Sequence, residues 1–458
     1  MVITLLAIVS VLYLALQLED KFKVPSPLGL IVLSFVFHAL MGDVFILTGD
    51  AEHFALLVLL LLPILLISDS LELSVADLKE HGLSLFYLAV VAVSLSVLAA
   101  LLMGNTLFSE YNLSTAAIIV LFAMVLATDP VSVVSIFSNF NLPHRLKILC
   151  EGESLFNDAT ALIVFVFIGL YALNGGEITA SYVAQVSVLV VLGSSALGVA
   201  FGYLGLILMK TTTNRTAEML ILILVGYGGF ELAEHFYALL NMLGVYSHMH
   251  LSGILTCIFA TITVNHMMMQ EMAKEEAVID QEEAILHRNS AVSGGVIRAA
   301  IDKIKSTVEE RERYLRTKED VQLLALVANT MLFVAMAELI NVSLLWQYKT
   351  EIIVMFLATT VIRAVMMAKF AVITNQTNKM TSINFRWWGV LTFAGIKGGL
   401  SIVMLMMIPA SFEHLEMFKA VVIGVILLST FIYSGILVTL ISKNQAIFSK
   451  EKEAEGSH

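Results

Sequence analysis

The sequence predicts an all-α polytopic membrane protein with about thirteen transmembrane helices. Of its 458 residues, 59% are hydrophobic and only 14% are charged, whereas a soluble globular protein carries about 25% charged residues. Apolar runs long enough to cross a bilayer, which takes about 20 residues per helix, recur along the whole chain. Because lipid cannot hydrogen-bond to the backbone, we expect each run to be a helix that satisfies its own backbone groups.

The apolar runs can be placed in order along the chain. They cover residues 1–18, 27–47, 53–73, 81–104, 114–138, 146–172, 181–209, 216–235, 246–265, 321–344, 349–372, 386–408 and 414–442. The first run lacks a basic region and a small-residue cleavage site, so we expect a retained helix and not a signal peptide.

The chain then divides into four parts. Residues 1–265 hold spans 1–9, residues 266–320 form a polar cytosolic loop, residues 321–442 hold spans 10–13, and residues 443–458 form a short cytosolic tail. We expect the loop to be either a helical hairpin or partly disordered. It is either a solvated connector or a segment that senses pH or binds a partner.

The positions of lysine and arginine predict the orientation in the membrane. With the N-terminus outside and the C-terminus in the cytoplasm, most of the 26 basic residues fall in inner loops. The exceptions are Lys349 and Lys419, near outer ends, and Arg363 and Lys397, within spans.

The spans can be read as two inverted six-helix repeats on either side of one central helix. Span 5 then pairs with span 12, seven spans later and therefore in the opposite orientation. Both look discontinuous, because Thr128-Asp129-Pro130 interrupts span 5 and Gly395-Ile396-Lys397-Gly398-Gly399 interrupts span 12. Paired breaks of this kind indicate the substrate site of a transporter. The alternative is a pair of ordinary kinks, which are common in membrane helices.

The charged residues in the breaks have a physical explanation. Half-helices that meet near the midplane bring positive N-terminal ends and negative C-terminal ends together. We expect Asp129 to neutralise the N-terminal ends and Lys397 the C-terminal ends. The hydroxyl and carbonyl of Thr128 are then free to face a cation.

Span 6 carries the candidate binding carboxylate. Ser154 and Asp158 are four residues apart and share a helix face, with Asn157 beside them. Their oxygen atoms suit a hard monovalent cation. Glu153 needs a partner if it is charged, and we expect that partner to be Arg363, the only arginine inside a span.

Several motifs occur in the order found in one known family. They are Thr128-Asp129-Pro130, Gly152-Glu153-Ser154-Leu155-Phe156-Asn157-Asp158, Ser252-Gly253-Ile254-Leu255, Ile362-Arg363, and Gly395-Ile396-Lys397-Gly398-Gly399-Leu400-Ser401. With these motifs the chain resembles the sodium/proton antiporters of the NhaP and NHE types.

The resemblance implies a function and a set of partners. It implies a homodimer in the cell membrane that exchanges Na⁺ or Li⁺ for H⁺ and serves pH homeostasis. It implies that Asp158 binds cation and proton alternately, with Na⁺ held by Asp158, Ser154 and Thr128 and with Asp129 assisting. It also implies that Asn157 marks an electroneutral exchanger, one cation for one proton.

The chain departs from the family pattern in three places. Lys397 stands where an arginine is usual, so the bidentate fork is lost. A glutamate of span 3 that helps to form the site in many relatives is replaced by Ser68 in the gapless register. Asp69, one residue on, is the candidate to take its place, on a side chain turned by about 100° around the helix. The segment 266–320 is longer than the usual connection.

Other readings of the sequence remain. A K⁺/H⁺ antiporter would use the same site, whereas an ion channel or a membrane sensor that has lost transport fits the single carboxylate site less well. No phosphate-binding loop, zinc spacing or nucleophile triad is present, so we expect no enzyme activity, no cofactor and no nucleic-acid partner. Cys150 and Cys257 lie in or beside apolar runs, and we expect both to be core residues.

Overall fold

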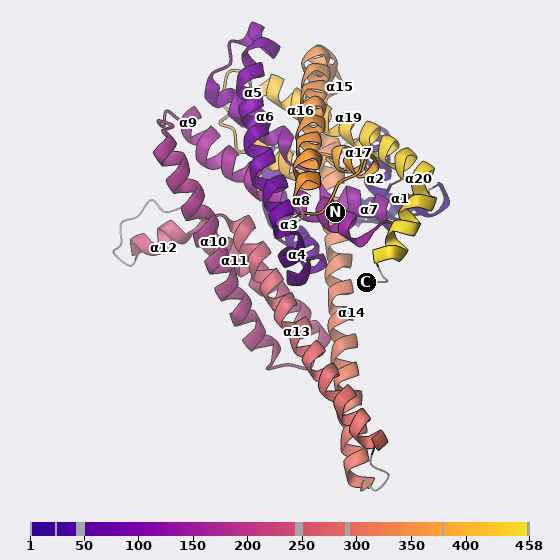
Figure 1. Cartoon of the computed structure of the whole chain (residues 1–458). Coiled ribbons are helices and arrows are strands. Elements are labelled where there is room, and N and C mark those ends of the chain that lie inside the picture. The colour runs from indigo at the N-terminus through magenta and orange to yellow at the C-terminus, as the bar shows by residue number, and fades with distance from the viewer. Residues whose placement is uncertain are drawn as a thin grey trace. The chain divides into compact units, whose positions relative to one another are not determined.

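Every regular element in the described residues of the computed structural model is a helix (Figure 1). The structure describes residues 2–22, 25–42, 51–242, 251–288, 294–377 and 380–455. The predicted all-helical membrane class is confirmed.

Within these ranges, nine helices are long and apolar enough to cross a membrane. They are Val75–Leu107, Thr115–Ser138, His144–Leu173, Ala180–Met209, Arg215–Glu234, Gly253–Lys274, Lys305–Glu338, Lys349–Gln376 and Leu415–Glu455. A shorter apolar helix covers Ser26–Leu40.

Each predicted span has a helical counterpart, and several are built from consecutive pieces. In chain order these are α1 (Val2–Phe22), α2 (Ser26–Met41), α3 (Ala51–Glu72), α4–η2–α5 (Val75–Phe86, Tyr87–Ala92, Val93–Leu107), α6–α7 (Thr115–Leu126, Pro130–Ser138), α8–η4–α9 (His144–Ile163, Val164–Leu170, Tyr171–Leu173), α10 (Ala180–Met209), α11 (Arg215–Glu234), α13 (Gly253–Arg288), α14 (Gly294–Glu338), α16 (Lys349–Gln376), α17–α18 (Phe385–Phe393, Gly399–Met406) and α19–η5–α20 (Leu415–Leu428, Ser429–Tyr433, Ser434–Glu455). Short helices η3 (Ser109–Tyr111), α12 (Phe236–Met242) and α15 (Val342–Gln347) connect some of them.

Some predicted boundaries differ from those observed. Span 10 was expected to reach residue 344, but α14 ends at Glu338 because Asn341 starts a new helix, its Oδ1 accepting a hydrogen bond of 3.1 Å from the backbone N–H of Leu344. Spans 2 and 9 were expected to include 43–47 and 246–250, which lie outside the described residues.

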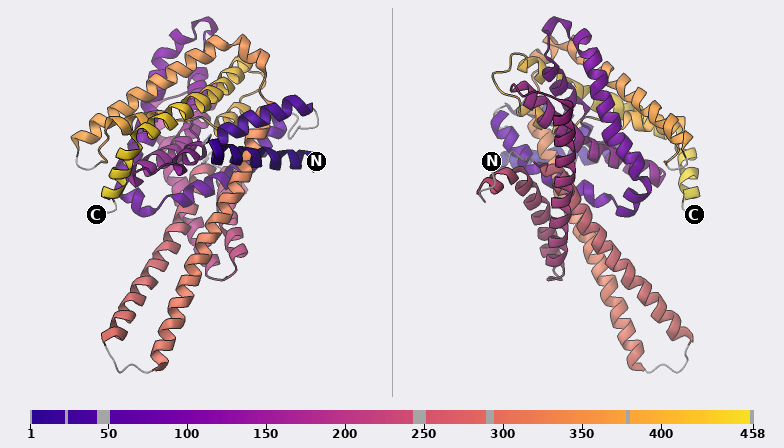
Figure 2. Two further views of the ribbon diagram at one scale, coloured as in Figure 1. Left: turned by 90° about the vertical axis from the view of Figure 1, so that its right-hand side faces the viewer. Right: turned by 60° about the vertical axis from the view of Figure 1, so that its left-hand side comes forward.

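The polar segment 266–320 forms the arms of a helical hairpin, which was one of the two alternatives expected. Figure 2 shows α13 and α14 continuing as long helices toward a connection at 289–293, which lies outside the described residues. α14 carries i,i+4 ion pairs on its surface, such as Arg316–Glu312 at 3.4 Å, which are typical of a helix in water. The Tyr314 hydroxyl donates to Asn265 Oδ1 at 3.2 Å and joins the two arms near their base. The cytosolic location of the hairpin stays a prediction.

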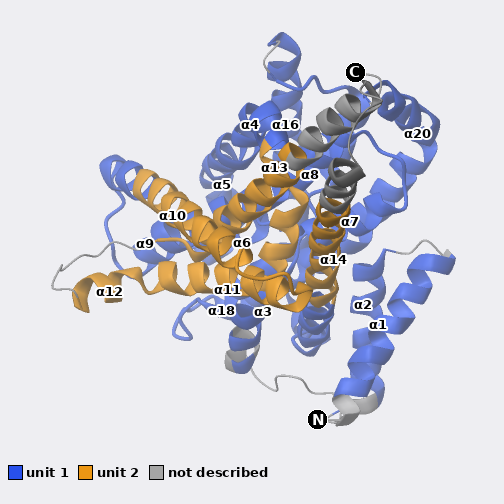
Figure 3. Ribbon diagram, turned by 90° about the horizontal axis from the view of Figure 1, so that it is seen from below, with its two compact units in different colours: residues 1–62, 76–187, 327–458 blue, residues 63–75, 188–326 orange. Residues whose placement is uncertain are grey.

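The chain divides into two compact units (Figure 3). Unit 1 comprises residues 1–62, 76–187 and 327–458, and unit 2 comprises residues 63–75 and 188–326. Unit 1 therefore contains both discontinuous helices. Each unit contains one buried cysteine, Cys150 in unit 1 and Cys257 in unit 2.

The predicted tail, residues 443–458, is largely helical. α20 continues from the last apolar span to Glu455 without a break.

Candidate functional site

The first helix break separates α6 from α7. Leu126 ends α6, Ala127–Asp129 are extended, and Pro130 is the first residue of α7, where its missing N–H costs nothing. Asp129 caps α7, because its Oδ2 accepts hydrogen bonds from the backbone N–H of Ser132 at 3.2 Å and from the Ser132 hydroxyl. The Asp129 side chain thus lies at the positive end of α7, as the charge argument expected.

The second break separates α17 from α18 and meets the first break directly. The backbone N–H of Asp129 donates to the carbonyl of Ile396 at 2.7 Å. Gly398 lies so close to Asp129 that an added Cβ would come within 2.5 Å of the aspartate Cβ. The chain crosses itself at this point, and the glycine permits the close approach.

Lys397 neutralises the carbonyl end of α6. Its Nζ donates to the carbonyl of Leu126 at 3.3 Å, and its side chain is buried. Its backbone N–H donates to Ser429 Oγ at 3.1 Å. The lysine therefore lies at the negative C-terminal end of α6, in the opposite broken helix, which is the contact that the sequence suggested.

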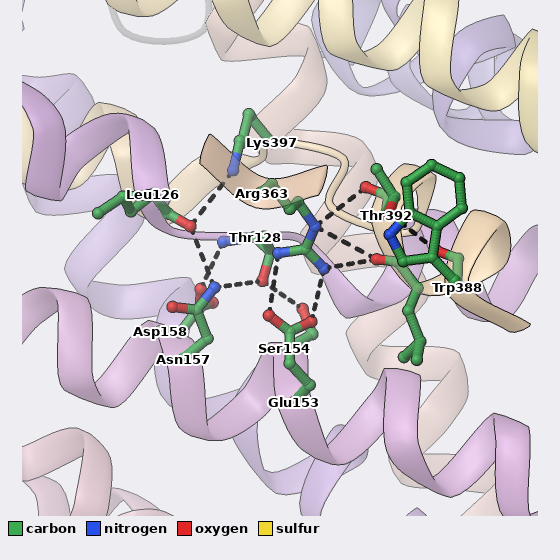
Figure 4. Close-up of polar contacts among 11 residues, drawn as sticks. Leu126, Thr128, Glu153, Ser154, Asn157, Asp158, Arg363, Trp388, Thr392 and Lys397 are labelled. Atoms are coloured by element: carbon green, nitrogen blue, oxygen red, sulfur yellow. Dashed lines mark hydrogen bonds and ion pairs between the residues drawn. The ribbon is translucent and has the colours of Figure 1, made fainter. Parts of the chain in front are cut away.

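α8 presents the candidate binding residues to the first break (Figure 4). Asp158 Oδ1 accepts the backbone N–H of Thr128 at 2.8 Å, and the Ser154 hydroxyl donates to Thr128 Oγ1 at 2.9 Å. Asn157 Nδ2 donates to Thr128 Oγ1 at 3.1 Å and to the carbonyl of Leu126 at 3.0 Å. The Asp158 carboxylate, the Ser154 hydroxyl and the Asn157 amide of α8 thus converge on Thr128 in the break, at one buried place where Asp158 is only 8% exposed.

Glu153 and Arg363 form a buried, bidentate ion pair. The two nitrogen–oxygen distances are 3.0 and 2.9 Å, and Glu153 and Arg363 are 2% and 8% exposed. The remaining donors of the guanidinium reach the carbonyls of Leu391 and Thr392 at the end of α17, at 3.0 to 3.3 Å. The pair expected from sequence is present, and Arg363 also ties α8 to α17.

A small cavity of about 20 Å³ lies beside this ion pair, with Glu153, Asn157, Arg363 and Lys397 among its lining residues. The volume is about that of one water or a small ion. Within the described residues no donor reaches Asn157 Oδ1, which is a buried acceptor. Asp158 does not line this cavity, so the space is next to the candidate site and not at its centre.

Asp69 and its neighbour Ser68 lie on α3, in the part of that helix that belongs to unit 2. Ser68 is 9% exposed and Asp69 is partly exposed. The involvement of Asp69 in ion binding stays a prediction.

The sequence did not indicate several groups that complete the site. Ser429 begins η5, a short π-helical segment, and η4 is a second such segment directly after the helix that carries Asp158. Such segments often mark functional positions in helices. The carbonyls of Leu391 and Thr392, which accept from Arg363, are the other unexpected partners, and backbone groups carry no signal in a sequence.

The chain is similar in sequence to known sodium/proton antiporters. Residues 5–281 match the family model described as sodium/hydrogen exchanger, transmembrane. The chain is 28% identical over 241 residues to the Na⁺/H⁺ antiporter NhaH of Halobacillus dabanensis, covering 52% of this chain and 59% of that protein. It is 24% identical over 384 residues to the Na⁺/H⁺ antiporter ApNhaP of Aphanothece halophytica, covering 83% and 63%. The chain spans between 42% and 59% of the length of the first curated relatives that it matches.

The fold is also found in a solved structure. The sodium proton antiporter MjNhaP1 from Methanocaldococcus jannaschii superposes with a TM-score of 0.67, covering 97% of this chain and 96% of that chain at 15% identity. At this identity the likeness concerns the fold alone.

Proposed function

Because this chain belongs to the sodium/hydrogen exchanger family, we propose that it is a secondary antiporter that exchanges Na⁺ or Li⁺ for H⁺ across a membrane. Asp158 is the residue whose occupancy alternates between cation and proton. The convergence of Asp158, Ser154 and Thr128 on one helix break is the observation that carries this proposal.

The chemistry of the site suits a monovalent cation. A desolvated carboxylate with hydroxyl oxygens beside it supplies the hard oxygen ligands that Na⁺ and Li⁺ prefer. A carboxylate at this depth is costly without a positive charge, so Asp158 is satisfied by a bound cation or by a proton. Cation and proton therefore compete for one group, and each loaded form can cross.

The other buried charges at the breaks have partners of their own, and in this proposal they stay the same through the cycle. Glu153 is paired with Arg363, Asp129 caps α7, and Lys397 faces the carbonyl of Leu126. One carboxylate that alternates between one proton and one monovalent cation gives a 1:1 exchange without net charge movement.

We further propose that the protein is a homodimer in the cell membrane, with its N-terminus outside and its C-terminus in the cytoplasm. The distribution of basic residues supports this orientation. In this setting the exchange serves pH and sodium homeostasis.

The test is ion-induced proton movement in proteoliposomes that contain the purified protein and a pH-sensitive dye. With an imposed pH gradient, addition of Na⁺ or Li⁺ is expected to dissipate the gradient at a rate that saturates with cation concentration. K⁺ is added in a parallel measurement, and a response to K⁺ in place of Na⁺ would replace the proposed substrate. If none of the three cations moves protons, antiport by this chain is excluded.

A further inference from the structure

The last turns of α20 contact the first turn of α17, the helix half that precedes the second break. The Glu451 carboxylate accepts hydrogen bonds from Arg386 Nη2 at 3.0 Å, from Trp387 Nε1 at 2.9 Å and from Asn384 Nδ2 at 3.3 Å. Asn384 is the residue that caps α17. Glu451 is therefore bound at the positive N-terminal end of α17 by three side chains.

One turn further along, Glu455 contacts the first turn of α8. Pro143 precedes α8, and because its ring carries no acceptor atom, it cannot cap the helix with its own side chain. Glu455 Oε2 accepts the backbone N–H of His144 at 2.7 Å and supplies that cap from 311 residues away in the sequence. Lys452, between the two glutamates, donates to Asn141 Oδ1 at 3.5 Å.

These two helices are the ones that the candidate site depends on. α8 carries Asp158, and the last carbonyls of α17 hold Arg363, which in turn holds Glu153 of α8. The pair of helices is thus joined at the level of the site by Arg363 and at their N-terminal ends by α20.

The contacts of α20 are partly exposed to solvent. Glu451 and Arg386 are 27% and 35% exposed, and an ion pair in such a setting is weak singly and is screened by salt. A cavity of about 500 Å³ borders Glu451 and Glu455, with Arg145 and Thr381 among its other lining residues. Water therefore reaches the contacts of Glu451 and Glu455 with α17 and α8, which are made by several individually weak bonds.

We propose that Glu451 and Glu455 are positioning residues, and that residues 451–455 form a strap that holds the N-terminal ends of α17 and α8 in register. The strap keeps α8, with its oxygen ligands, in the position relative to α17 that cation binding requires. This inference rests on the proposed antiport, since it assigns the strap an effect on cation affinity.

The test compares Glu451→Ala, Glu455→Ala and the double variant with Glu453→Ala. Glu453 is exposed on the same turn of the same helix and matches the others in charge and size. The double variant is expected to raise the KM for Na⁺ roughly fivefold, the factor that corresponds to one lost exposed ion-pair contact, while kcat changes little. Restoring charge with Glu451→Asp is expected to recover part of the affinity.

A second measurement does not depend on transport. Hydrogen exchange of the backbone amides at the start of α8 and α17 is expected to be faster in the double variant than in Glu453→Ala. If the double variant does not fold, the two single variants carry the same comparison. An unchanged KM together with unchanged amide protection would overturn the strap.

The two proposals fail in different ways. If wild type and Glu453→Ala move no cation, the antiport proposal is wrong, and the strap's effect on affinity is wrong with it. If both exchange normally and the strap variants match them in KM and in amide protection, antiport stands and the strap is wrong.

Discussion

Asp129, Glu153 and Asp158 are all buried carboxylates near the helix breaks, but their partners differ. Asp129 is bound by the N-terminal end of α7, and Glu153 is bound by a guanidinium. Asp158 accepts a backbone N–H and lies beside hydroxyl groups. Because the partners differ, removal of each carboxylate has a different consequence.

Asp158→Asn is expected to abolish cation-induced proton movement, because it removes the charge that cation and proton share. The protein should remain folded, since an amide of nearly the same size can keep the contact with the N–H of Thr128 through its oxygen. Asp158→Glu should retain partial activity with an altered order of Na⁺ and Li⁺, because the carboxylate shifts by one methylene. Exchange at the wild-type rate by the asparagine variant would contradict the role of Asp158.

Arg363→Ala is expected to act on stability first. It leaves Glu153 buried without its cationic partner, which typically costs roughly 3 to 5 kcal/mol. Thermal unfolding in detergent should therefore show a lower midpoint than wild type.

The matched control is the double variant Glu153→Ala with Arg363→Ala. Removing both charges should recover part of the lost stability, although the carbonyls of Leu391 and Thr392 lose their donor as well. A double variant no more stable than Arg363→Ala alone would mean that the ion pair does not explain the loss.

At the scale of helices, the two breaks form one structure, because each uses the other's backbone. The N–H of Asp129 bonds to the carbonyl of Ile396, and Lys397 bonds to the carbonyl of Leu126. Each break therefore depends on the other for part of its hydrogen bonding.

Gly398→Ala is expected to disrupt this crossing. The new methyl would meet the Asp129 Cβ at 2.5 Å, so the two backbones must separate, and overpacking of this kind costs about 1 to 3 kcal/mol. We expect lower exchange activity and lower thermal stability. Gly435→Ala in α20 is the control, because apart from the neighbouring backbone of its own helix no atom of the described residues lies within 4 Å of the place its methyl would take, and helix propensity there favours alanine. Equal effects of both substitutions would show that the crossing tolerates the added bulk.

The sequence was sufficient to predict these breaks and several contacts. Proline and glycine reveal where a helix stops, the i,i+4 spacing puts Ser154 and Asp158 on one face, and Arg363 was the single arginine available inside a span. The remaining contacts could not be predicted, because their partners are backbone carbonyls or residues far along the chain. Glu455 and His144 illustrate this, since nothing local to either residue indicates the other.

At the scale of the molecule, loops of unit 1 that contact each other are loops that the predicted topology places on the same side of the membrane. His144 and Asp77, from two loops expected on the inner side, are 3.1 Å apart. The Tyr111 hydroxyl donates to Glu351 at 2.6 Å, and its ring lies 5.7 Å from that of His414, all three being expected on the outer side. The grouping follows from the number of spans between the loops, which the hydropathy pattern indicated.

Exchange is expected to be indifferent to membrane potential. In the proposed mechanism Asp158 carries one proton or one monovalent cation, so both crossings move the same net charge. In proteoliposomes with a potassium–valinomycin potential but no sodium or pH gradient, no net sodium or proton movement should occur. Movement driven by the potential would indicate a second titrating group, and Asp69 would be the first residue to substitute.

The burial of both cysteines makes the chain ready for site-specific labelling. Cys150 and Cys257 are each at most 1% exposed, and the sequence contains no other thiol. A cysteine introduced at Lys443 in unit 1 and another at Lys274 in unit 2, both exposed positions, would therefore take up spin labels without removal of the native residues. Pulsed dipolar spectroscopy on that pair, with and without sodium, would give the distance between the two units in each state of the transport cycle.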